Sequence, residues 1–146
     1  MEDLKKEVSQ DITAENTAAL EEAGEIVRAE RIRALLSYAT GSETVYRHPL
    51  LKVRYTEGVK LMAEECGAYW LIDLVVSHQL NPRVRREAFQ VWELRRCKTS
   101  PRWKAVCTDG NENRVTSQLI EFSDFPLPEG IKIYCCDGVI LLPSEY

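Results

Sequence analysis

The stretch "GAYWLIDLVVSHQ", residues 67–79, places one acid, Asp73, inside an otherwise apolar run. A carboxyl group in such a run can serve as a general acid or base, or it can be a packing device held by hydrogen bonds. Buried acids usually have structural partners. We therefore predict that Asp73 is a buried structural acid that accepts hydrogen bonds from backbone N–H groups or from an arginine such as Arg47 or Arg54.

The cysteines and histidines form no recognisable site for nucleophilic or metal chemistry. The five cysteines include no CxxC pair, and adjacent residues such as Cys135 and Cys136 point to opposite faces of a strand, so they cannot hold one metal ion together. His48 and His78 are the only histidines and have no acid or cysteine at ligand spacing. We predict no metal site and free thiols throughout.

No glycine-rich loop, nucleophile elbow or paired-carboxylate pattern occurs in the chain. The sequence therefore predicts no catalytic residue and no cofactor. One alternative stays open, namely an enzyme of unknown class that uses Asp73 and His48.

Charge is strongly segregated along the chain. Residues 1–30 contain nine acids and three bases, whereas residues 83–104, "RVRREAFQVWELRRCKTSPRWK", contain eight bases and two acids. We expect the basic segment to form a rim with one aromatic side chain, and we predict that this rim binds a partner. The predicted partner-binding residues are Arg83, Arg85, Arg86, Arg95, Arg96, Lys98, Arg102, Trp103 and Lys104. A solvated edge that prevents strand aggregation is the simpler alternative.

The first half of the chain predicts helices. Residues 1–30 are typical of a weakly amphipathic acidic helix, which continues to a stop at Gly41. A second helix is expected between a Thr56 N-cap and Gly67. Residues 68–80 are apolar almost all round, which favours a buried helix over a buried strand.

The second half predicts four to five strands separated by turn signals, among them Asp109-Gly110-Asn111 and the two-residue turn Asp137-Gly138. Helices grouped first and strands grouped last indicate an α+β domain, with an antiparallel meander and the central helices packed on one sheet face.

Several uncommon strings occur together in this chain: "YRHPLLKVRYTEGVKLMAEECGAYWLIDLVVSHQ", "FQVWELR" and "SDFPLPEGIKIYCCDGVILLPSEY". With them the chain resembles a family of small proteins of unknown function found on bacterial chromosomes, plasmids and phages. The resemblance implies a single domain over residues 38–146 and an acidic helical extension over residues 1–37. It implies no catalytic residues.

Bulk composition excludes some classes of protein. No apolar run approaches the roughly 18 residues of a membrane span, and the N-terminus lacks the apolar core of a secretory signal, so we expect a cytoplasmic protein. The leading hypothesis is a small protein-binding module. The resemblance, together with the small size of the chain, implies a more specific role as a mobile-element-encoded inhibitor of a host defence system that acts by direct protein contact. A nucleic-acid-binding accessory protein is the first alternative, although the net charge of −4 argues against general affinity for nucleic acid. A homodimer stays open.

Overall fold

The computed structural model describes residues 2–41 and 43–146, with side chains from residue 13 onward. Its helices are α1 (Glu2–Ser37), α2 (Glu57–Cys66), α3 (Tyr69–His78), α4 (Pro82–Arg85) and the 3-10 turn η1 (Pro143–Glu145). Its strands are β1 (Val45–Arg47), β2 (Arg54–Thr56), β3 (Phe89–Arg96), β4 (Trp103–Thr108), β5 (Arg114–Ile120), β6 (Ile131–Cys136) and β7 (Val139–Leu141). The mixed α+β class predicted from the sequence is confirmed.

The limits of α2 follow from local signals. The hydroxyl oxygen of Thr56 accepts a hydrogen bond from the N–H of Val59 at 3.3 Å, which caps the helix N-terminus. Gly67 ends the helix with a left-handed backbone, φ 60°, a conformation that costs glycine little. Both ends were expected from the sequence, as was the apolar helix α3.

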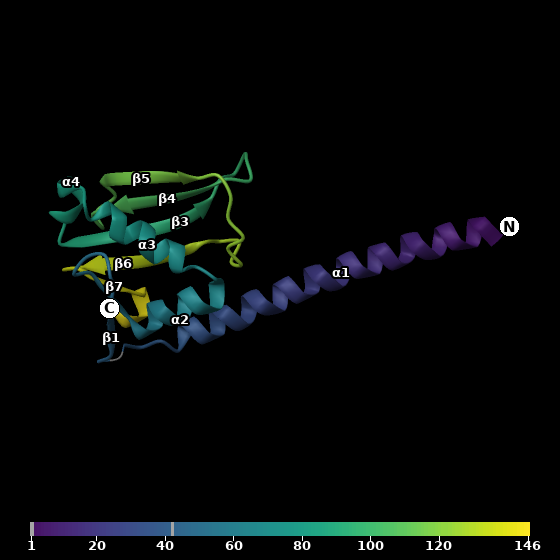
Figure 1. Ribbon diagram of the computed structural model, residues 1–146, viewed down its shortest axis with the longest axis horizontal. Coiled ribbons are helices and arrows are strands. Elements are labelled where there is room, and N and C mark those ends of the chain that lie inside the picture. The colour runs from purple at the N-terminus through teal and green to yellow at the C-terminus, as the bar shows by residue number, and fades with distance from the viewer. Residues whose placement is uncertain (1, 42) are drawn as a thin grey trace.

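The sheet is larger than the predicted meander. It has seven strands in the order β1-β2-β7-β6-β3-β4-β5 (Figure 1). All neighbouring pairs are antiparallel except β2 and β7, which are parallel. The meander of four to five strands is therefore corrected, because β6 pairs back onto β3, and β7 pairs with both β6 and β2, which extends the sheet to the β1–β2 hairpin. Sequence order alone does not specify such a long-range pairing.

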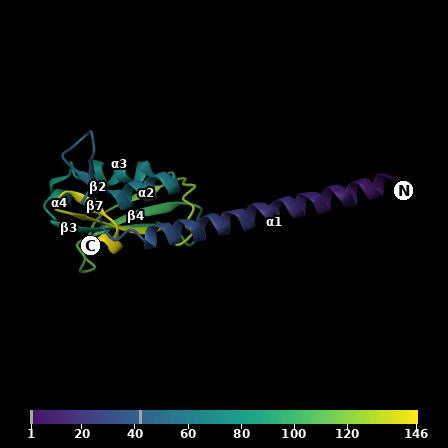
Figure 2. The same ribbon diagram turned by 90° about the horizontal axis from the view of Figure 1, so that it is seen from below.

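The two faces of the sheet differ in what covers them. α2 and α3 lie over one face (Figure 2), where strand register aligns buried side chains such as Trp92 with Ile133 and Cys107. Side chains alternate along a strand, so their neighbours point to the opposite face. In the described part of the chain that face carries only η1 and the C-terminal Tyr146 over one end and is otherwise formed by strand side chains. We call it the open face.

Helix α1 leaves the domain as a long straight rod (Figure 1). Only its C-terminal part joins the core, where Ala29 and Ile32 are buried and α1 packs beside α2. The side chains of residues 13–28 are all exposed, and we call this segment the acidic arm. The helix ends at Ser37, and its residues Ala29 and Ile32 already belong to the core of the domain.

The C-terminal turn is joined to the start of α2 by Glu145. One oxygen of its carboxylate accepts a hydrogen bond from the hydroxyl of Thr56 at 2.6 Å and another from the N–H of Leu142 at 2.9 Å. Gly58 makes room for this carboxylate, because a Cβ atom there would lie 2.5 Å from the nearer Glu145 oxygen. The strings "YTEGV" and "LLPSEY" therefore form one structural unit.

Candidate functional site

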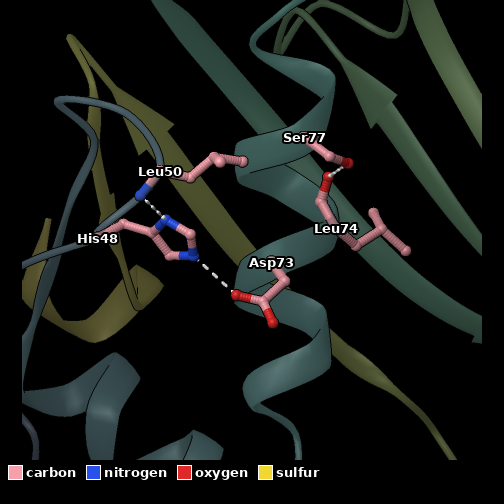
Figure 3. A network of polar contacts seen from close by, with 5 residues as sticks. All are labelled: His48, Leu50, Asp73, Leu74 and Ser77. Atoms are coloured by element: carbon pink, nitrogen blue, oxygen red, sulfur yellow. Dashed lines mark hydrogen bonds and ion pairs between the residues drawn. The ribbon is translucent and has the colours of Figure 1, made fainter.

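Asp73 lies on the surface, which contradicts the prediction of a buried acid. Its side chain is 67% exposed and accepts a hydrogen bond from Nε2 of His48 at 2.7 Å (Figure 3). The buried member of the pair is the histidine, whose side chain is 10% exposed. The apolar run misled the prediction because α3 buries most of its circumference but leaves one narrow side, with Asp73 and Ser77, in solvent.

Both ring nitrogens of His48 have partners. The N–H of Leu50 donates to Nδ1 at 3.1 Å, so the proton of the neutral ring sits on Nε2 and points to Asp73 (Figure 3). A general base needs an unprotonated nitrogen facing substrate, and this ring offers none in that state. The pair is therefore suited to holding the loop between β1 and β2 against α3.

The buried thiols are poor nucleophiles. Burial raises the pKa of Cys66 to about 11 and that of Cys107 and Cys135 to about 12, so these three groups remain protonated at neutral pH. All five cysteines are free. Among the described residues no group of three or more histidine, cysteine or acidic side chains is placed to hold a metal ion.

The predicted basic rim does not form one surface. Arg83, Arg85 and Arg86 lie in or next to α4, before the start of β3, whereas Arg95 and Arg96 lie at the end of this strand. The eight residues of β3 separate the two groups by about 25 Å. Figure 1 shows α4 and the β3–β4 turn at opposite ends of the sheet.

Trp103, the aromatic residue expected on the rim, is buried. It is 3% exposed and packs edge-on against Phe125, with ring centroids 5.8 Å apart. It cannot stack on a nucleic-acid base in this position. Two of the rim arginines have acidic partners: Arg95 pairs with Glu93 at 2.9 Å and Arg102 with Glu121 at 3.0 Å.

The α4 group borders a cavity of about 520 Å³. Lys52, Arg85 and Arg86 line it together with the buried amides of Gln79 and Gln90. The two amides hydrogen-bond to each other at 2.9 Å, and in addition Gln79 donates to a backbone carbonyl at 3.0 Å. Their hydrogen-bonding capacity is used within the protein, so these amides fix the core. The acids Glu87 and Asp137 also line the cavity, so its charged groups are of both signs.

The open face gathers positive charge from strands that are distant in sequence. Register places six basic side chains on it, and the only acid among the strand residues of this face is Glu93. In the described part of the chain, Arg95 is the only one of the six with an ion pair, and that pair is with Glu93. The six are Arg47, Arg54, Arg95, Lys104, Arg114 and Lys132.

Aromatic and aliphatic side chains lie among these cations. Phe89, Tyr134 and Tyr146 form a cluster with ring centroids 5.0 to 5.7 Å apart. Leu119 is exposed beside Lys104, its partner across the β4–β5 pair. The open face therefore combines basic, aromatic and aliphatic groups, the mixture that is typical of protein interfaces.

Of the six basic residues, the sequence reasoning singled out only Arg95 and Lys104 as partner-binding. Arg47, Arg54, Arg114 and Lys132 lie outside the basic segment, and only the pairing of strands brings them onto the same face. The alternation of basic and apolar residues in "IKIY" is a signal that could have placed Lys132 on the face opposite Ile131 and Ile133. Which face α2 and α3 would cover was not readable from this pattern.

Among the described residues, no helix is both long enough and apolar enough to cross a membrane. No curated protein and no solved structure matches the chain. Residues 30–146 match a family of unknown function, DUF6876. The match includes the last turns of α1, the whole sheet and the C-terminal turn, and leaves the acidic arm outside. The chain belongs to this family of unknown function.

Proposed function

We propose that the protein acts by direct contact with another protein and that the open face is its contact surface. The observation that carries this proposal is the gathering of six basic side chains and an aromatic cluster on the one sheet face that α2 and α3 leave uncovered. Five of these cations lack an ion pair within the described chain, so they are available to a partner.

The chemistry of the open face specifies the kind of partner. Arginine and tyrosine are enriched at protein interfaces because they combine large contact area with hydrogen bonding. A surface with six bases and one acid attracts an acidic partner and speeds its association at low salt. We therefore propose an acidic protein surface as the ligand, and binding in place of catalysis as the activity.

Nucleic acid is the second candidate ligand. The same cations could contact phosphates, and Tyr134 and Phe89 are at least half-buried beside them. Two features favour protein: the net charge of the chain is −4, and the aromatic rings contact one another. Stacking on bases would require a ring face free of such contacts.

The resemblance to proteins found on plasmids and phages leads to a narrower proposal. The chain is encoded by a mobile element, works in the cytoplasm, and inhibits a host defence system by occupying an acidic surface of one of its components. Small size and a single binding face suit such a role, because an inhibitor needs contact area and no reaction chemistry.

A site-specific photo-cross-linker tests the proposed surface. Leu119 lies on the open face and is 47% exposed, whereas Leu80 follows α3 on the helical side and is 59% exposed. A cross-linking amino acid at position 119 should capture protein in cells that carry the chain, and the same group at position 80 should not. The captured protein should be lost when Lys104→Glu and Lys132→Glu are added.

Capture of nucleic acid at position 119, with a strong decrease as salt rises, would favour the second candidate instead. Equal capture at both positions would show that the open face has no special role in binding.

A further inference from the structure

The acidic arm needs a covering surface that its own domain does not provide. The side chains of residues 13–28 are all exposed, Leu20 by 73%, and at the end of the arm Arg28 donates a hydrogen bond to the backbone carbonyl of Glu65 at 3.1 Å. An isolated helix of this length is marginally stable in water, so a rod of this kind gains its stability from packing. Figures 1 and 2 both show the arm extending away from the sheet.

The apolar side of the arm points away from its own core. Each residue turns a helix by about 100°, which puts Leu20, Ala23 and Val27 on one side. The buried residues Ala29 and Ile32 lie on nearly the opposite side of the same helix. A straight α1 therefore cannot turn its apolar side onto its own domain, and only another molecule can cover it.

The negative charge of the acidic arm indicates the kind of surface to which it can bind. The arm contains four glutamates and one arginine, so two arms placed side by side repel each other. The open face has six bases and one acid and includes the exposed aliphatic side chain of Leu119. Glu15 lies about 80° from Ala23 around the helix, so it is the acid of the arm nearest to the apolar side and can reach cations on a sheet below.

The length of α1 outside the core is also sufficient to cross the width of the sheet. Residues 2–28 of α1 extend about 40 Å, and a sheet of seven strands is about 30 Å wide. We infer that the acidic arm of one copy docks on the open face of a second copy, and that the arm of the second copy docks on the open face of the first. This produces a closed dimer with two-fold symmetry. The inference rests on the proposed function of the open face and specifies an acidic helix as the structure it recognises.

Charge reversal with compensation tests this docking in the full chain. Glu15→Lys reverses the acid nearest to the apolar side, and Lys104→Glu with Lys132→Glu changes the open face. Each of these two variants should weaken dimerisation by about tenfold or more at low salt, measured by sedimentation equilibrium. Combining all three substitutions should restore the dimer, because the reversed arm then meets a reversed face.

Two matched variants control for the change in net charge. Glu25→Lys reverses an acid on the opposite side of the same helix, and Arg83→Glu with Arg86→Glu reverses two bases in and next to α4. Both variants should retain most of the dimer. Circular dichroism and thermal melting of every variant establish that it folds.

Three results would overturn the inference. A full chain that stays monomeric at low salt, while position 119 still captures another protein, excludes the second copy and leaves the proposed function intact. A dimer that survives reversal of Lys104 and Lys132 indicates paired arms instead of docking on the sheet. Failure of the combined variant to dimerise, when the arm variant and the open-face variant are each folded, shows that the two charged groups do not meet.

Discussion

At the scale of the residue, the pair of His48 and Asp73 shows how an exposed acid can serve a buried histidine. The ring of His48 is held from both sides, by Asp73 and by the N–H of Leu50. Because Asp73 is mainly in solvent, its interaction is weakened by screening. The histidine, by contrast, fills space beneath the loop between β1 and β2.

This geometry predicts unequal effects of substitution. Asp73→Asn keeps an oxygen that can accept from Nε2 and should lower the free energy of unfolding by less than about 1 kcal/mol. His48→Ala removes a buried ring with two hydrogen bonds and should cost about 2 to 3 kcal/mol. Urea denaturation measures both. Equal costs would show that Asp73 contributes more than its exposure allows.

The thiols provide a second prediction at this scale. At pH 8 an alkylating reagent should label the partly exposed Cys97 and Cys136 first, and label the buried Cys66, Cys107 and Cys135 only on unfolding. Mass spectrometry of the labelled native protein checks this order. Rapid modification of all five would mean that the core opens readily.

The raised pKa values of the buried thiols also predict a pH dependence of stability. The thiols of Cys66, Cys107 and Cys135 have a pKa of 9.0 in the unfolded chain, whereas burial raises this pKa to about 11 to 12 in the folded chain. The unfolded state therefore loses protons first, and stability should fall as pH rises above about 9, by up to about 1.4 kcal/mol per pH unit for each thiol. Cys66→Ala should make this decline shallower.

At the scale of the element, the N-terminus of α2 and the C-terminal turn are coupled through Gly58 and Glu145. Gly58→Ala would add a methyl group where the Glu145 carboxylate lies, and the flexible glutamate would have to move and lose its hydrogen bonds. We expect a loss of about 1 kcal/mol in the wild-type background.

The same substitution should be neutral or slightly stabilising in a Glu145→Ala background, because alanine favours a helix more than glycine does. A double-mutant cycle from denaturation curves gives the coupling energy between the two positions. Additive effects would mean that the carboxylate contributes nothing through its position over Gly58.

At the scale of the whole molecule, we expect the domain to keep nearly the same stability without the acidic arm, although the arm and the open face carry opposite charge. Deleting residues 1–24 removes seven acids and two bases and keeps Ala29 and Ile32 in the core. The melting temperature should change by no more than about 2 °C, since exposed side chains contribute little to stability.

The truncated protein should elute from heparin at higher salt than the full chain, because the open face loses its acidic competitor. Adding Lys104→Glu and Lys132→Glu should reverse this gain, whereas Arg83→Glu and Arg86→Glu should reverse less of it. If truncation leaves heparin binding unchanged, the acidic arm does not shield the basic surface.

The sequence by itself determined the features that depend on neighbouring residues. It predicted the ends of α2 at Thr56 and Gly67, the apolar helix α3, and the tight turn at Asp137 and Gly138, whose φ angles are 49° and 76°. Helix caps, turn residues and strand alternation all act within a few residues, so a single sequence contains them in readable form.

Only the tertiary structure decided which face of the sheet is covered, how β6 and β7 connect β3 to β2, and where the charges gather. The burial of Trp103 and the exposure of Asp73 both depend on contacts with distant segments. The basic segment spans the length of β3, so its charges divide between two ends, while Arg47 and Lys132 reach the open face from other strands. Such pairings are selected by packing of the whole chain, which no local pattern specifies.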